Sequence, residues 1–250
     1  MFSKSGFSFA GESITGLVRR RNEDNFLIVA SADGKVALAA VADGVGGHRH
    51  GEIASYISCR DLGREFMKYP EEVLLEKGGA ERFLAETVGT INRHVFNINF
   101  HERARHPMSS TLVAVLFIPG AAIMLNVGDS RFYMVRPDGM VEQLSTDHTL
   151  ANDEEYAHLR SGMTSWEQHT ISRSIGTRQA LKAEYKRIKL TGGERFCLCT
   201  DGVYHDLDDE TIKTILSQED SPKQTVNCLM RSVLLCGAHD NTTVVSVFSK

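Results

Sequence analysis

Two Asp-Gly pairs in this chain stand where an apolar, strand-like run stops and a loop leads toward a helical pattern. They are Asp43-Gly44, in VALAAVADGVGGHRHGE, and Asp201-Gly202, in RFCLCTDGVYHD. Two other pairs, Asp33-Gly34 and Asp138-Gly139, lie between two strand-like runs, which is the usual setting of a hairpin turn. The first two pairs therefore predict strand ends that present a carboxylate to a site.

Three further acidic positions also fall at strand ends. Asp129 follows AIMLNVG, Asp240 precedes NTTVVSVF, and Asp24, with Glu23 before it, precedes NFLIV. Each acid alone fits a turn or a helix cap, but five strand ends together favour convergence. Two carboxylates about 4 Å apart repel by roughly 1 kcal/mol in water and roughly 4 kcal/mol at an effective dielectric near 20. A cation or a proton must therefore lie between them.

The candidate ligands are hard oxygen atoms, and no His/Cys set has the spacing of a zinc site, so the expected ions are Mg²⁺ or Mn²⁺. Two such ions can share a carboxylate and position an activated water for in-line attack on phosphorus. Gly44 fits this role because a residue without a Cβ lets its own carbonyl approach an ion closely. The pattern indicates phosphate-ester chemistry.

Composition excludes several other classes of protein. The 250 residues carry a net charge of −4, and the basic residues are scattered apart from RRR at 19–21, so we expect no nucleic-acid partner. The five cysteines are odd in number, which favours a reducing compartment; Cys197 and Cys199 lie in an apolar run and are expected in the core. The N-terminus lacks an apolar signal segment, and Pro119-Gly120 breaks the longest apolar run. We expect a soluble, cytoplasmic monomer with no membrane partner, formed by one domain over residues 1–250.

The order of elements predicts an α+β fold with two largely antiparallel sheets and helices on the outer faces. Helical periodicity covers 51–69 and places Ile53, Tyr56, Ile57 and Phe66 on one face. It also covers 81–98, where one face contains Leu84, Val88, Ile91, Val95 and Ile98. A short helix is expected at 209–217, and a last helix runs from the N-cap Ser221 to Gly237. Strands are expected at 7–15, 25–32, 35–42, 111–118, 121–127, 131–136, 141–144, 184–190, 195–200 and 242–248.

Seven motifs resemble, in order, those of the metal-dependent serine/threonine protein phosphatases of type 2C, the PPM family, in their compact bacterial form. They are GLVRRRNEDN, VADGVGGH, NVGDSRFYMV, LSTDHTL, ISRSIGT, CLCTDG and AHDNTTVVSV, spread over about residues 8 to 248. The resemblance implies a four-layer α-β-β-α sandwich and a dinuclear Mn²⁺/Mg²⁺ centre between the sheet ends. It also implies phosphorylated proteins as partners, namely targets of a serine/threonine kinase and the kinase itself.

The resemblance assigns roles residue by residue. Asp43 would bridge both ions, the Gly44 carbonyl would hold one, and Asp201 and Asp240 would hold the other. Asp24 would act at the metals mostly through water, with Glu23 as a further contributor. Asp129 would be a ligand of a third, weaker metal site, and Arg19 would bind the substrate phosphate. His48 would be the general acid, and metal-bound water is the alternative proton donor. Hydrolysis would be direct, without a phosphoenzyme.

Some segments depart from the family pattern. Val203-Tyr204-His205 follows Asp201-Gly202 where Leu-Thr or Leu-Ser is common, and His205 stands where some relatives have an acid, which bears on the third metal site. Residues at about 148–170 fall where the family carries a flap, with Trp166 as a flap anchor or a substrate contact. Two alternative functions remain open from the sequence: a pseudophosphatase that acts as a binding module, and a phosphatase of a small phosphate ester. The complete set of core acids disfavours the first.

Overall fold

The fold is a sandwich of two antiparallel sheets, seen in a computed structural model that describes residues 6–45 and 50–249. Within these residues each sheet has five strands. The first sheet contains, in spatial order, β1 (Phe7–Ile14), β10 (Thr242–Ser249), β9 (Arg195–Cys199), β6 (Arg131–Val135) and β7 (Val141–Gln143). The second contains β2 (Asn25–Ala30), β3 (Ala37–Ala42), β4 (Leu112–Ile118), β5 (Ala121–Val127) and β8 (Glu184–Lys189).

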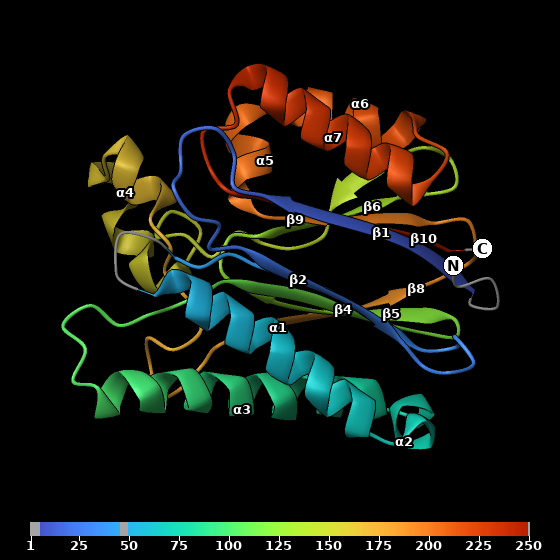
Figure 1. Cartoon of the computed structure of the whole chain (residues 1–250), viewed down its shortest axis with the longest axis horizontal. Helices are drawn as coiled ribbons and strands as arrows, with labels where there is room; N and C mark the ends of the chain where they lie inside the picture. Colours follow the sequence, from blue (N-terminus) through green and yellow to red (C-terminus); the bar gives the residue numbers. More distant parts are fainter. Residues whose placement is uncertain (1–5, 46–49, 250) are drawn as a thin grey trace.

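Helices cover both outer faces, so the four-layer α-β-β-α arrangement is confirmed (Figure 1). The second sheet packs against α1 (Gly51–Lys68) and α3 (Gly79–His101), which are joined by the short α2 (Glu71–Leu75). The first sheet packs against α5 (Asp201–Asp206), α6 (Asp209–Gln218) and α7 (Pro222–Cys236). A third apolar cluster fills the space between the two sheets and includes Phe117, Phe132 and Phe196.

The strands match their sequence-based expectations to within two residues at each end, because the central strands are almost wholly apolar and the turns between them are well signalled. Asp33-Gly34 and Asp138-Gly139 form the expected turns, with Gly34 and Gly139 at φ values of 72° and 87°. The last helix has the expected caps: the Ser221 hydroxyl accepts from the Gln224 amide, and Gly237 ends the helix at φ 115°. Cys197 and Cys199 are buried in the core, as expected.

The face expected for α1 is half right. Ile57 and Phe66 are buried as expected, but Ile53 and Tyr56 are 40 % and 52 % exposed, and the buried face also includes Ala54 and Leu62. The helix is rotated because small residues allow it to lie close to the sheet: a Cβ on Gly63 would contact the side chain of Leu27. The face predicted for α3 is correct, since Leu84, Val88, Ile91 and Val95 are buried and Ile98 packs against the same core.

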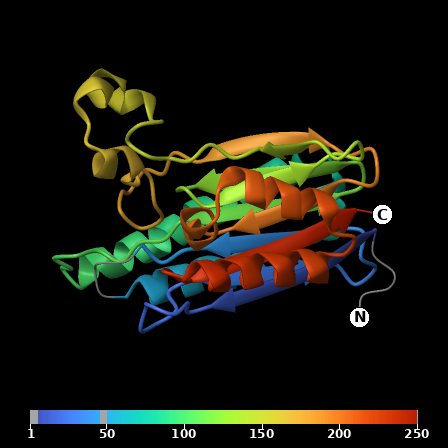
Figure 2. The same cartoon turned by 90° about the horizontal axis from the view of Figure 1, so that it is seen from above.

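The segment at about 148–170, which was expected to be a flap, forms helices that the sequence did not predict. A 3-10 helix (Glu154–Gly162) and α4 (Ser165–His169) have no buried residues, and Figure 2 shows them projecting from one end of the sandwich. They are attached through Asp153, which is buried and accepts from Ser172 Oγ at 3.0 Å and Arg173 Nε at 2.8 Å. Trp166 is 77 % exposed, so it does not anchor the flap by burial.

Candidate metal centre

Five acidic side chains lie at one end of the sandwich because the antiparallel strands alternate in direction. Asp24 precedes β2 and Asp43 follows β3; Asp129 follows β5, Asp201 follows β9, and Asp240 precedes β10. A cavity of about 330 Å³ opens there. It is lined by Arg19, Glu23, Asp43, Gly44, Val45, Ile171, Asp201, Asp240 and Asn241. The structure therefore brings together most of the residues predicted from the sequence; Asp24 and Asp129 are buried and do not line the cavity.

Asp43 is fixed by its backbone at the end of β3. Its amide donates to Thr111 Oγ1 at 2.9 Å, and its carbonyl accepts from the Thr111 amide at 2.8 Å. Burial raises the pKa of Asp43 well above its usual range, and the charges of Asp201, Asp24 and Asp129 raise it further. Burial also raises the pKa of Asp201, although the nearby His205 opposes this shift. These carboxylates are unfavourable as unaccompanied anions.

Asp24 and Asp129 each have one buried carboxylate oxygen without a hydrogen-bond partner among the residues that the structure describes. Oδ2 of Asp24 accepts from the hydroxyls of Thr200 and Thr243, both at 2.8 Å, while its Oδ1 has no hydrogen-bond partner among the described residues. Oδ1 of Asp129 likewise has no hydrogen-bond partner among the described residues. Burial is the main cause that raises the pKa of Asp24 to about 7 and that of Asp129 to about 8. Buried polar atoms are rarely left unpaired, so an ion or ordered water is expected beside each of them.

Gly44 is required for packing. A Cβ at this position would overlap the backbone of Gly51 and the carbonyl oxygen of Glu23. The Gly44 amide donates to that carbonyl at 3.0 Å, which ties the end of β3 to the residues just before β2. Glu23 itself lines the cavity, and burial together with the charge of Glu52 raises its pKa.

Arg19 reaches the cavity from the loop after β1. Its Nη2 donates to Asp240 Oδ2 at 2.5 Å, and the side chain is 48 % exposed. Burial lowers the pKa of Arg19, but the bond to Asp240 and the charges of Asp201 and Asp43 outweigh this effect and raise it. The guanidinium therefore lies beside the acids, where a bound phosphoryl group could compete with Asp240 for it.

The residues fit divalent cations by their chemistry. They offer hard oxygen atoms, two of them buried and unpartnered, in a site where burial and like charge disfavour bare carboxylates. In the part of the chain that the structure describes, no three Asp, Glu, His or Cys side chains already have the arrangement of a metal-ligand set. Asp240 is instead bonded to Arg19. Binding a cation at Asp240 requires this contact to open.

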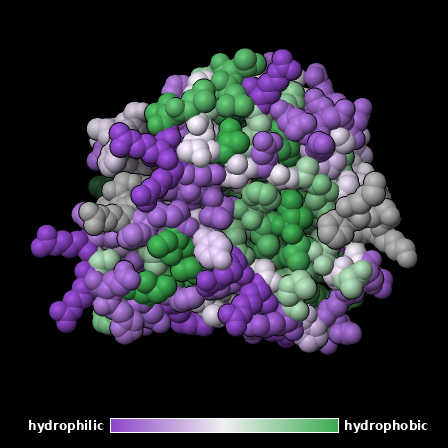
Figure 3. All heavy atoms as spheres, in the orientation of Figure 1, coloured by the Kyte–Doolittle hydropathy of each residue, from purple (hydrophilic) through white to green (hydrophobic). Residues whose placement is uncertain are grey.

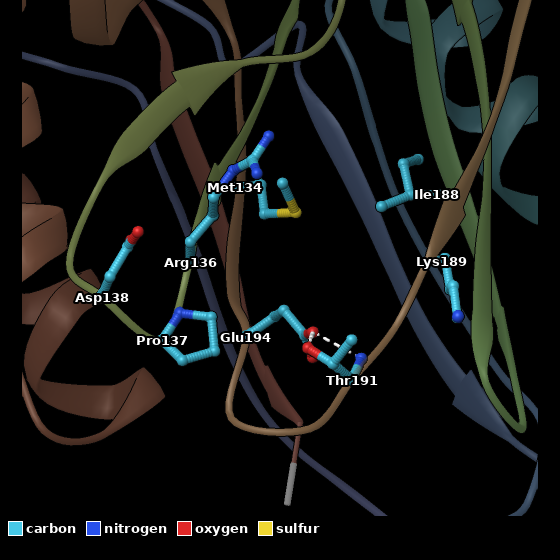
Figure 4. A pocket seen from close by; sticks show the side chains of 8 residues that line it. All are labelled: Met134, Arg136, Pro137, Asp138, Ile188, Lys189, Thr191 and Glu194. Atoms are coloured by element: carbon cyan, nitrogen blue, oxygen red, sulfur yellow. Dashed lines mark hydrogen bonds between the residues drawn. The ribbon is translucent and has the colours of Figure 1, made fainter.

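A second cavity, of about 500 Å³, lies at the other end of the sandwich and lacks this chemistry (Figure 4). Its buried acid, Glu194, accepts hydrogen bonds from the Thr191 amide and hydroxyl at 2.6 Å and from the Gly192 amide at 3.0 Å. Those bonds lower the pKa of Glu194 against the effect of burial. This carboxylate holds a turn in place, whereas the acids at the opposite end are left to interact with one another.

The candidate general acid, His48, lies outside the described residues. His205, which stands where some relatives have an acid, places its Nδ1 3.5 Å from Asp201 Oδ2. Its neighbour Tyr204 donates its hydroxyl to the carbonyl of Asp129 at 3.0 Å, and Arg131 stacks on the Tyr204 ring at 3.6 Å. The segment that departs from the family pattern thus touches two of the predicted ligand residues.

Several positioning residues were not identified from the sequence. Thr200 and Thr243 hold Asp24, and Thr111 holds Asp43. His148 accepts from the Gly128 amide at 3.1 Å, and burial together with Arg173 lowers its pKa to about 4, so the ring is neutral beside the loop that carries Asp129. Thr200 and Thr243 lie within motifs in which the acid received the predicted role, His148 lies within LSTDHTL, where no residue received a role, and Thr111 lies outside the seven motifs. None of the four therefore gave a sequence signal of its own.

Asn241 is the most connected of these residues. Its side-chain amide donates to the carbonyls of Thr15 and Arg21 at 2.9 and 2.8 Å, and its Oδ1 accepts from the Glu23 amide at 2.9 Å. It therefore fixes both ends of the loop that carries Arg19.

We expect Asn241→Ala to leave three backbone groups unpaired and to lower the free energy of unfolding by about 2–3 kcal/mol. Because Arg19 would also lose its fixed position, KM for a phosphopeptide should rise more than kcat falls. Chemical denaturation and steady-state kinetics check both effects. A variant whose KM equals that of the unaltered protein would contradict this role for the loop.

Comparison with known proteins agrees with the fold. The family model described as Protein phosphatase 2C matches residues 18–232. The serine/threonine phosphatase stp of Listeria innocua is 28% identical over 93% of this chain and 92% of its own length. The serine/threonine protein phosphatase PstP of Mycobacterium tuberculosis is 30% identical over 95% of this chain, which corresponds to 44% of PstP.

Solved structures of bacterial serine/threonine phosphatases have a similar fold. The catalytic domain of PstP in complex with 2 manganese ions has a TM-score of 0.78 and 30% identity, with 97% of both chains covered. A serine/threonine phosphatase of S. agalactiae has a TM-score of 0.84 and 27% identity, covering 98% of this chain and 100% of its own. The fold is that of the metal-dependent phosphoprotein phosphatases. The chain belongs to the protein phosphatase 2C family and acts on phosphorylated serine and threonine in proteins.

Proposed function

We propose that the strand-end acids hold the two Mn²⁺ or Mg²⁺ ions with which this chain removes phosphate from phosphoserine and phosphothreonine. Asp43 would contact both ions, the Gly44 carbonyl one of them, and Asp201 and Asp240 the other. Asp24 would act through water, with Glu23 beside it, and Asp129 would hold a third, weaker ion. The observation that carries the proposal is the gathering of five carboxylates at one end of the sandwich, two of them with a buried oxygen that has no described protein partner.

When bound, divalent cations lower the pKa of coordinated water and stabilise charge on the phosphoryl oxygens. Side chains of the protein itself would bind the phosphate, orient the acids and donate the proton. Arg19 lies at the cavity and can exchange its contact with Asp240 for two parallel hydrogen bonds to a phosphoryl group. Thr200 and Thr243 keep Asp24 turned toward the site, and Thr111 holds the end of β3. His48 stays a proposed proton donor to the leaving oxygen.

The substrates, the oligomeric state and the domain organisation are also proposed. We propose targets of a serine/threonine kinase, and that kinase itself, as substrates, and a cytoplasmic monomer as the working form. The chain would be one catalytic domain over residues 1–250, with 148–170 as a flap beside the site. None of the helices that the structure describes has the length and apolar character needed to cross a membrane. The net charge of −4 gives no support to a nucleic-acid partner.

The proposal is tested by phosphate release from a phosphothreonine peptide and from an aryl phosphate. With Mn²⁺ present, both should be hydrolysed; with a chelator, both activities should fall to background and return on adding Mn²⁺. Turnover that persists in chelator would overturn the metal centre. Hydrolysis of the aryl phosphate but of no phosphopeptide would favour the small-ester alternative.

Arg19 gives a separate prediction because its planar guanidinium can bind two phosphoryl oxygens at once. We expect Arg19→Ala to raise KM for the phosphopeptide by about tenfold or more, in line with the loss of a charge-assisted hydrogen bond. Arg19→Lys should recover only part of this loss. Arg20→Ala is the matched control, since Arg20 is exposed on the same loop and does not line the cavity. Equal KM values for the Arg19→Ala and Arg20→Ala variants would contradict the role of Arg19.

A further inference from the structure

The loop between β1 and β2 is held rigidly although much of it is exposed. The Leu17 amide donates to the Ala238 carbonyl at 2.8 Å, and the Asn241 side chain binds the loop at Thr15 and Arg21. Gly16 has φ 76°, and a Cβ there would overlap the carbonyl oxygens of Ala238 and Asp240. The loop therefore lies directly on the turn between α7 and β10, and its shape is set before any partner binds.

This fixed loop presents apolar side chains to solvent. Leu17 and Val18 are 68 % and 62 % exposed, and at the nearby C-terminal end of α7 Leu234 and Leu235 are 43 % and 79 % exposed. We call these four residues the apolar corner. Figure 3 shows hydrophobic side chains gathered at the upper left of the molecule, where Figure 1 places the end of α7 and the loop after β1. Single exposed apolar residues are common, but a group on a rigid rim often marks a binding surface.

The apolar corner adjoins, along the chain, residues that line the catalytic cavity. Arg19, which lines the cavity, follows Val18 directly in the chain, and the turn that receives the Leu17 amide leads within two residues to Asp240. An extended peptide advances about 3.3 Å per residue. A segment whose phosphorylated residue reaches Arg19 would therefore place a side chain two or three residues away against Leu17 and Val18.

We propose that the apolar corner binds an aliphatic side chain of the phosphorylated protein substrate, two or three residues from the phosphorylated serine or threonine. This rests on the proposed function, because it assigns the occupant of a surface beside the phosphate site. The substrate is the occupant that this adjacency favours, because a peptide whose phosphate binds Arg19 has neighbouring residues within reach of Leu17 and Val18. A lipid surface or a second copy of the chain has no such reason to be there. The corner would select among phosphoproteins without taking part in the chemistry.

The test uses two phosphothreonine peptides of equal length and charge. One carries Leu at the positions two and three residues to either side of the phosphothreonine, and the other carries Ser at the same positions. The unaltered protein should show kcat/KM about tenfold higher for the Leu peptide, as expected for burying part of one or two aliphatic side chains. The double variant Leu17→Ser/Val18→Ser should lose this preference and keep its Mn²⁺-dependent hydrolysis of an aryl phosphate.

Met67→Ser is the matched control, because Met67 is also 68 % exposed but lies in the last turn of α1. It should keep the full preference for the Leu peptide. Equal kcat/KM for the two peptides in the unaltered protein, or a preference that survives in the double variant, would overturn the inference. The inference would also be overturned if the double variant kept its peptide preference but lost binding to anionic vesicles or lost self-association. Failure of the unaltered protein to hydrolyse the aryl phosphate would instead refute the proposed function.

Discussion

Replacing Asp43 with Asn should lower kcat for both an aryl phosphate and a phosphopeptide by about 10³-fold, because cation contacts contribute several kcal/mol of charge stabilisation. The change removes the negative charge that two cations would share and keeps the size of the side chain. The backbone bonds of Asp43 to Thr111 do not involve the carboxylate, so the end of β3 should keep its place. Steady-state kinetics at saturating Mn²⁺ measures the effect.

Asp33→Asn is the matched control for this experiment. Asp33 is followed by Gly34 just as Asp43 is followed by Gly44, but its carboxylate accepts from Ser31 and from the Lys35 amide within a hairpin turn. This variant should keep full activity. A variant with Asn at position 43 that retains activity within tenfold of the unaltered protein would show that Asp43 is not a shared ligand.

The second large effect is on stability without metal. Asp24 and Asp129 have folded-state pKa values of about 7 and about 8, above the ordinary value of a carboxyl group. The folded state therefore binds more protons than the unfolded state between about pH 4 and these values, so stability is highest at low pH and falls as pH rises. One carboxyl group with a pKa of about 7 costs about 3 kcal/mol between pH 5 and pH 8.

Protein kept in chelator should thus unfold at a lower denaturant concentration at pH 8 than at pH 5, and added Mn²⁺ should remove most of the difference by compensating the carboxylate charges. Asp24→Asn should make the chelated protein less sensitive to pH over this range. Chemical denaturation at several pH values gives the comparison. A chelated protein equally stable at pH 5 and pH 8 would contradict the picture of crowded, buried acids.

Strand ends proved to be the most informative sequence feature. An apolar run that begins or ends beside an acid indicates both the strand and the position of the carboxylate, so the sequence alone predicts that Asp43, Asp201 and Asp240 lie together. Helix rotation was harder to predict: the face through Ile53 and Tyr56 fitted the period of α1, but small residues on another face allowed closer packing on β2. Periodicity alone does not measure that closeness.

The flap and the positioning residues were harder for a different reason. The segment 154–169 forms helices without burying any residue, so it has no apolar pattern to reveal them. Asn241, Thr200 and Thr243 act through hydrogen bonds to residues far away in the chain, such as Asp24 and Thr15. Such partners depend on the tertiary fold, and the local sequence carries little trace of them.

The most direct test of the account is a crystal structure of the protein soaked in Mn²⁺, with anomalous scattering recorded to locate the ions. Two strong peaks about 4 Å apart are expected for a dinuclear centre, with oxygens of Asp43 near both, Asp201 and Asp240 near one, and Arg19 turned away from Asp240. Peaks absent from this end of the sandwich, or bound to other side chains, would contradict the account.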